Sequence, residues 1–147
     1  MQNCIIEHFR SSRDFLVSEF PITVENDRLN FYERNVYQPS GILVNDKREG
    51  YWVIKIDYSF PPSVYIKRGH YKNGRQEGKW TVFVNGKLET IEHYKDGKLD
   101  GRVIIYLGDM KIDQIYKNGR SNGLKKFYDL NGKLIRMENW INGRLIN

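Results

Sequence analysis

Apolar residues recur at every second position in short stretches along the C-terminal two thirds of the chain. In one of these stretches Trp80, Val82 and Val84 alternate with other side chains, and an Asn-Gly pair follows at 85–86. Alternate side chains of a β-strand point to the same face, and Asn-Gly is a strong signal for a tight hairpin turn. A second alternating stretch comes after the turn, at 88–94. The pattern therefore predicts a β-hairpin.

The hairpin pattern recurs at a nearly constant interval, which indicates a repeat protein. The glycines that open successive copies are 23, 22 and 24 residues apart. A longer copy comes first, because NDKREGYW from residue 45 matches NGRQEGKW from residue 73, with Asp46 in place of the glycine and an insertion around Pro61 and Pro62. The other copies begin with YKNGR at 71–75, YKDGK at 94–98, YKNGR at 116–120 and WINGR at 140–144.

Equivalent residues of the copies form rows on two faces of the expected sheet. The row Trp80 and Val103 lies on one face, and the row Phe83, Tyr106 and Tyr128 lies on the other. We therefore expect an all-β chain, an elongated and twisted antiparallel sheet of about nine strands or more. The predicted units lie near residues 43–70, 71–93, 94–115 and 116–139, with a partial unit at 140–147.

The recurring motif resembles a known repeat. The pattern Y-K-[ND]-G-[KR]-x-x-G, followed by a strand, Asn-Gly and a second strand, is similar to the MORN repeat in its bacterial, YwqK-like antitoxin variant, over about residues 44–147. The resemblance implies a β-hairpin solenoid without enzymatic activity. It also implies protein binding, an antitoxin or immunity role in bacteria, or association with acidic lipids.

Residues 1–42 lie outside the repeats and differ from them in charge. They carry a net charge of −2, whereas the other 105 residues carry +8. We expect a non-repeat cap, mainly of strands, at an open end of the sheet. The expected strands are 15–17, 22–24 and 29–32, and Ile5, Ile6 and Phe9 are expected in a helical turn.

Composition supports a folded chain and limits its location. Hydrophobic residues make up 39% and charged residues 29% of 147 residues, which is ordinary for a globular protein. Aromatic residues reach 14% and favour strands. The single cysteine, Cys4, allows no intrachain disulfide, and no apolar run has the length of a signal peptide or a membrane span. We therefore expect a cytoplasmic protein.

Candidate catalytic groups are few. They are Cys4, His8, His70 and His93, and the sequence has no nucleophile elbow, phosphate loop or paired-cysteine pattern. His70 and His93 occupy equivalent positions in successive units, about 10 Å apart if each unit adds two strands, which is too far for a shared zinc ion. The sequence therefore predicts no enzyme, no cofactor and no metal site.

Basic residues recur beside the glycines, and they allow two interpretations. Lysines at sheet edges prevent unwanted strand pairing and improve solubility. A row of positive charge also attracts an acidic protein, an anionic lipid or a nucleic-acid backbone. The residues are Lys47, Arg48, Lys72, Arg75, Lys95, Lys98, Lys117, Arg120 and Arg144.

The aromatic row allows two interpretations as well. Phe83, Tyr106 and Tyr128 serve either in cross-strand packing or as a recognition surface, because tyrosine offers a large contact area at low entropic cost.

We therefore expect a non-enzymatic protein-binding module, with a toxin as one possible partner and an oligomeric state left open. Inhibitors of nuclease toxins tend to imitate acidic nucleic acid. A basic chain does not, so a nuclease toxin is disfavoured as the partner. The alternative is a peripheral scaffold on acidic lipid. Nucleic-acid binding ranks last, since the basic residues are expected in loops and not among the aromatic ones. The candidate partner-binding residues are Phe83, Tyr106, Tyr128, Tyr94, Tyr116, Lys72, Arg75, Lys95, Lys98, Lys117 and Arg120.

Overall fold

The described residues, 4–6, 36–59 and 61–146 of a computed structural model, form twelve strands in one antiparallel sheet and no helix. This confirms the predicted all-β class and the sheet of β-hairpins. The strands are β1 (Cys4–Ile6), β2 (Val36–Val44), β3 (Lys47–Ser59), β4 (Pro62–Lys72), β5 (Arg75–Val84), β6 (Lys87–Lys95), β7 (Lys98–Leu99), β8 (Gly101–Leu107), β9 (Met110–Lys117), β10 (Arg120–Asp129), β11 (Leu134–Ile141) and β12 (Arg144–Leu145).

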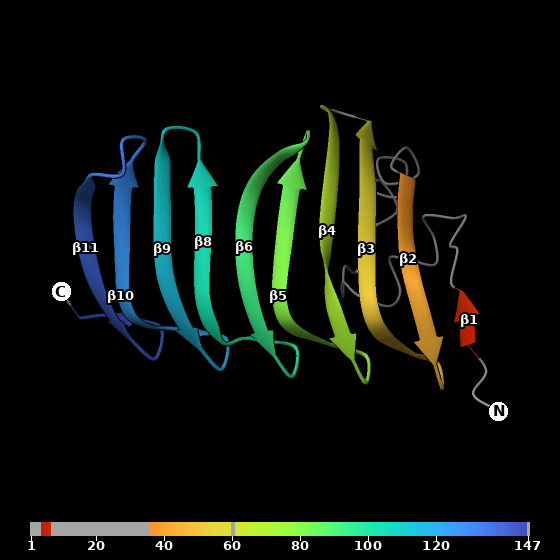
Figure 1. Cartoon of the computed structure of the whole chain (residues 1–147). Coiled ribbons are helices and arrows are strands. Elements are labelled where there is room, and N and C mark those ends of the chain that lie inside the picture. Colours follow the sequence, from red (N-terminus) through yellow and green to blue (C-terminus); the bar gives the residue numbers. More distant parts are fainter. Residues whose placement is uncertain (1–3, 7–35, 60, 147) are drawn as a thin grey trace, which may run out of the picture.

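The order of the strands in the sheet follows the order of the chain (Figure 1). From β2 to β11 each strand pairs with its neighbours along the chain, with one exception. The two-residue strand β7 pairs only with β6, so β8 pairs with β6 and β9. Hairpin follows hairpin from β2 to β11, and the sheet stays open, with β1 at one end and β12 at the other (Figure 1).

Tight turns gather along one long side of the sheet, which we call the turn edge (the lower side in Figure 1). Both residues of these turns have positive φ, for example 51° at Asn73 and 77° at Gly74. Asparagine, aspartate and glycine tolerate this conformation best. Asp46, which replaces the usual glycine, adopts φ 59° and keeps the turn. The turns are 45–46, 73–74, 96–97, 118–119 and 142–143.

The second glycine of each motif has a different role from the first. In the copy KDGKLDG, residues 95–101, the first glycine belongs to the two-residue turn 96–97 between β6 and β7, and the second, Gly101, begins β8. The second glycines, such as Gly78 with φ 69°, lie where the strand pairing changes register. Between β4 and β5 the pairing jumps from Arg68–Thr81 to His70–Glu77. The second glycine therefore allows a β-bulge.

The N-terminal part differs from the expectation in two places. β2 spans the predicted boundary near residue 43, because it pairs with β3 from Val36 onward. Ile5 and Ile6 lie in β1, paired with Leu43 and Ile42, and not in a helical turn. The strands expected at 15–17, 22–24 and 29–32 lie outside the described residues, as does Phe9.

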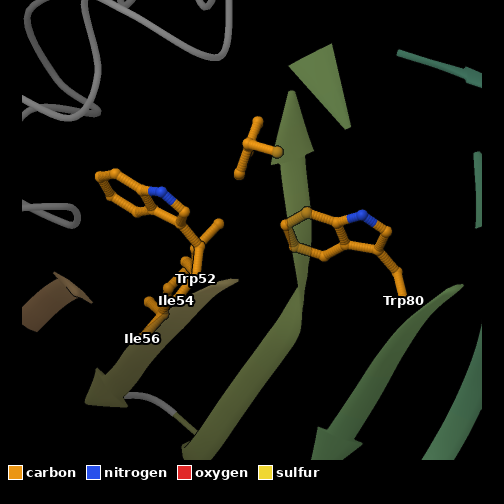
Figure 2. Close-up of a cluster of buried hydrophobic side chains, with 5 residues drawn as sticks. Trp52, Ile54, Ile56 and Trp80 are labelled. Carbon is orange, nitrogen blue, oxygen red and sulfur yellow. The ribbon is translucent and has the colours of Figure 1, made fainter. Parts of the chain in front are cut away.

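The core of the sheet lies on one face, which we call the core face. Trp52, Ile54 and Ile56 lie along β3, and Trp80 lies beside them from β5 (Figure 2). Both indole rings are 0% exposed. Burying a side chain the size of isoleucine stabilises a protein by about 1.5–3 kcal/mol. Together with Tyr71, these residues form the main cluster of the described hydrophobic core.

Glycine makes room for each of the two buried tryptophans, Trp52 and Trp80. A Cβ added to Gly41 would overlap the ring of Trp52, and one added to Gly69 would come within 2.3 Å of the ring of Trp80. The indole Nε1 atoms donate to the carbonyl oxygens of Glu49 and His70, each at 3.1 Å. Each ring is thus held flat against a neighbouring strand that has no side chain at that point.

Candidate binding surfaces

The eleven candidate residues separate into three places. Tyr94 and Tyr116 lie on the core face, because Tyr94 pairs with Gly78 and packs against Trp80 while Tyr116 pairs with Gly101. Phe83, Tyr106 and Tyr128 lie on the opposite face. Lys72, Arg75, Lys95, Lys98, Lys117 and Arg120 flank the turns of the turn edge.

A ladder of aromatic rings crosses the first hairpins on the core face. Trp52 meets Tyr71 with ring centroids 5.9 Å apart, Tyr71 meets Trp80 at 5.0 Å, and Trp80 meets Tyr94 at 6.3 Å. All three pairs are edge-to-face, a favourable arrangement for aromatic rings. Successive strands are therefore joined by ring contacts as well as by backbone hydrogen bonds.

A half-buried polar network surrounds the end of this ladder. The Lys67 ammonium lies 3.0 Å from a Glu92 carboxylate oxygen and donates to the Tyr94 hydroxyl at 3.1 Å. The Tyr94 hydroxyl in turn donates to Glu92 at 3.0 Å. Burial, and next the charge of Glu92, raises the pKa of Tyr94 well above its usual value. Because its hydroxyl and ring are both engaged within the chain, Tyr94 is a packing residue.

A second tyrosine faces the same carboxylate. Burial raises the pKa of Tyr65 from 10.0 to about 12, and the Glu92 charge adds to the effect. Burial also raises the pKa of Tyr71, although the nearby Arg48 guanidinium acts in the other direction. Both phenols are therefore neutral over the whole physiological range.

The opposite face combines aromatic rings with cations. The Arg68 guanidinium lies 4.6 Å from the centroid of the Phe83 ring, and the Lys111 ammonium lies 4.3 Å from that of Tyr128. Lys111 pairs across the sheet with both Tyr106 and Tyr128. Tyr106 is 38% exposed. The row thus offers flat rings with positive charge beside them.

Ion pairs compensate other cations of this face. The Arg102 guanidinium donates to both oxygens of Asp113, at 2.8 and 2.6 Å. This bidentate contact lowers the pKa of Asp113 and raises that of Arg102. Lys55 pairs with Asp57 at 2.9 Å.

On the turn edge, basic residues face each other across three of the five turns, 73–74, 96–97 and 118–119. Lys72 lies opposite Arg75, and Lys95 lies opposite Lys98. Their stems also have a packing role, because a Cβ on Gly97 would lie 3.6 Å from the Cβ of Arg75. A turn glycine thus rests against the stem of a basic residue from the preceding turn.

One partner-binding candidate on this edge is already paired. The Lys117 ammonium lies 3.1 Å from an Asp100 carboxylate oxygen.

Sequence reasoning missed the residues that hold one turn to the next. The side chain before each second glycine accepts the backbone N–H of the following turn, as Glu49 does from Asn73 at 2.7 Å. At an equivalent position Asp100 accepts from the backbone N–H of Asn118 and from the Lys117 ammonium, and these contacts lower the pKa of Asp100. The aligned motifs held the signal, since an acidic or amide residue recurs there. The pairs are Glu49 with Asn73, Glu77 with Asp96, Asp100 with Asn118, and Asn122 with Asn142.

The described residues contain no group of three or more His, Cys, Asp or Glu side chains that could hold a metal ion. His70 and His93 lie on β4 and β6, with β5 between them. Within the same residues no helix has the length and apolarity needed to cross a membrane. No protein-family model matches the sequence, and no curated protein matches it.

Proposed function

We propose that this chain is a non-enzymatic protein-binding repeat module that recognises its partner with the face opposite the core. The observation that carries the proposal is the aromatic row on that face, Phe83, Tyr106 and Tyr128, with the cations of Arg68 and Lys111 over two of the rings. Tyrosine and arginine are enriched where proteins bind one another. Cations beside the rings favour a partner with acidic side chains.

The aromatic residues of the two faces differ in exposure, and this difference supports the proposal. The core face uses its aromatic residues for internal packing, since Trp52, Tyr71, Trp80 and Tyr94 contact one another. The opposite face retains exposed apolar and aromatic side chains, including Tyr51, Tyr106 and Ile115. A partner that covers this face would bury surface that the chain leaves in water.

The finer proposal follows from the resemblance to MORN repeats of the antitoxin kind. We propose that the partner is a toxin in the bacterial cytoplasm and that this chain is its antitoxin or immunity protein. The net charge of +6 argues against a nuclease toxin, because a basic inhibitor does not imitate nucleic acid.

The test is capture of one stoichiometric partner from native host cells, by the chain and by two variants. Phe83→Ala/Tyr106→Ala/Tyr128→Ala should lose the partner, with a loss of affinity of at least about a thousandfold, since two interface aromatics at about 2 kcal/mol each already account for that factor. The control, Leu130→Ala, changes an exposed turn residue and should capture normally. Equal capture by the triple variant and the control would exclude the aromatic row as the binding surface.

A second candidate function rests on the turn edge, where basic residues line one side of the sheet. We propose, as the alternative, that this row binds acidic lipid, at about 1 kcal/mol for each residue near the surface. Sedimentation with phosphatidylserine vesicles should then show binding that falls with salt and is lost in Lys95→Ala/Lys98→Ala/Lys117→Ala/Arg120→Ala. Unchanged sedimentation of this variant would assign the row to solubility.

A further inference from the structure

An open hollow of about 560 Å³ lies where β4 and β5 change register. Two glycines, Gly69 and Gly78, form part of its lining, and a Cβ on Gly78 would meet nothing within 4 Å. The other lining residues are Tyr51, Arg68, His70, Glu77, Lys79 and Thr81.

The side chains of the hollow are mainly cationic or hydrogen-bond donors. Arg68 donates from Nε to the Thr81 hydroxyl at 3.4 Å, and neither Arg68 nor Lys79 has an ion pair with a carboxylate among the residues that the structure describes. The one carboxylate of the lining, Glu77, accepts the backbone N–H of Asp96 at 3.0 Å. Positive charge is therefore in excess here.

The repeated backbone allows a comparison with equivalent places. A bulge of the same kind recurs between β2 and β3 and between β9 and β10, and β6 meets β8 at the corresponding point. The pair equivalent to Arg68–Thr81 is Ser40–Val53 in the first, Asp113–Lys126 in the last and Ile91–Ile104 between β6 and β8.

The residues equivalent to His70 and Lys79 also differ. Between β9 and β10 they are Ile115 and Leu124, both apolar and exposed. Between β6 and β8 they are His93 and Arg102, but Arg102 is tied to Asp113 and His93 lies against the Arg102 carbonyl oxygen at 2.7 Å. The hollow between β4 and β5 is therefore the place, among the described residues, where this geometry carries uncompensated cations.

We propose that this hollow is a binding subsite for an oxyanion, a carboxylate or a phosphate, held between the Arg68 guanidinium and the Lys79 ammonium. Arginine presents paired donors that match such groups, and lysine adds a mobile point charge. The Thr81 hydroxyl and the His70 ring supply further polar contacts, and the Tyr51 ring, 5.3 Å from the His70 ring, forms a wall. The inference goes beyond the proposed function and does not depend on it.

The test is an NMR titration of the isotope-labelled chain with two probes, inorganic phosphate and an acetylated tetraglutamate peptide. Saturable shifts are expected at the backbone amides of Gly78, Lys79 and Thr81. Arg68→Met/Lys79→Met should weaken binding by at least about tenfold, because hydrogen bonds to charged groups contribute about 1.5–3 kcal/mol. The matched control, Lys55→Met/Lys126→Met, removes two cations of the same face outside the hollow and should bind within about twofold of the parent chain.

The two probes separate the sources of the ligand. Saturation by the peptide alone would assign the hollow to acidic side chains of a polypeptide, and saturation by phosphate would assign it to a free ion. Shifts spread equally over the turn edge, or equal binding by both double variants, would overturn the proposal. Lys79→Met alone, which removes a side chain without an ion pair in the described structure, covers the case in which the double variant does not fold.

The result is independent of partner capture. A chain that binds oxyanions in the hollow but captures its partner equally well without the aromatic row would retain this inference and lose the proposed function.

Discussion

Equivalent backbone positions of the repeat are filled in opposite ways between β4 and β5 and between β9 and β10. Trp80 lies nine residues after Tyr71. Its large ring covers Gly69, which has no side chain. Lys125 lies nine residues after Tyr116 and pairs with Gln114. Its ammonium lies 5.1 Å from the Phe127 ring and 5.8 Å from the Trp140 ring. A tryptophan is thus replaced by a cation that packs on rings.

The difference extends to the strands around each join. The residues of the main core cluster come from β3, β4 and β5. At the other end β11 is largely exposed, with Ile135 58% and Met137 53% accessible. Segments with few buried contacts open more easily than the core of the same protein. The repeat therefore keeps its geometry along the sheet while its packing weakens toward the C-terminus.

The largest expected effect comes from removing a ring at the strong end of the sheet, the end where β3, β4 and β5 hold the core cluster. Trp80→Ala should lower the free energy of unfolding by about 3–5 kcal/mol, because it leaves a cavity where an indole was 0% exposed. Lys125→Ala, at the equivalent position, should cost less than about 1 kcal/mol. Urea denaturation of both variants measures the contrast. Equal losses would show that the two ends are packed alike.

A smaller effect is expected from filling the space under the ring. Gly69→Ala places a Cβ within 2.3 Å of the Trp80 ring, and overpacking of this kind costs about 1–3 kcal/mol. Trp80→Val should relieve the clash, so Gly69→Ala should cost much less in that background. Denaturation of the four chains of this cycle gives the coupling energy, and strict additivity would contradict the packing described here.

The turn-to-turn hydrogen bonds should contribute less than the rings. Glu77→Ala removes the acceptor of the Asp96 N–H and should cost about 0.5–1.5 kcal/mol. Glu77→Gln keeps an acceptor and serves as the control. Amide hydrogen exchange at Asp96 should become faster in the alanine variant and stay slow in the glutamine variant. Unchanged exchange in both would remove this contact from the forces that join the units.

The smallest effect concerns alkaline pH and the strong end alone. The pKa of Tyr65 rises from 10.0 in the unfolded chain to about 12 when folded, so the folded chain retains a proton that the unfolded chain loses. This stabilisation is complete below pH 10 and declines as the pH rises from about 10 to about 12. Tyr65→Phe should flatten the decline in thermal stability over that window. An identical decline with Tyr65→Phe would contradict the assignment.

The hairpins and the two faces of each strand follow from local patterns along the chain. Alternation is a local property, so Trp80, Val82 and Phe83 could be assigned to faces from one strand. The Asn-Gly and Asp-Gly turns were equally readable, because few residues accept positive φ. The period of the repeat then predicted one sheet in chain order, as observed.

The contacts between neighbouring hairpins, by contrast, are set by the folded sheet. The bulge at Gly78, the ring of Trp80 over Gly69 and the bond from Asp96 to Glu77 each depend on which residues face one another across a strand pair. Strand register and bulges combine contributions from segments many residues apart, and no single period records them. The hollow beside Arg68 and Lys79 follows from that register, which is why no pattern in the sequence predicts it.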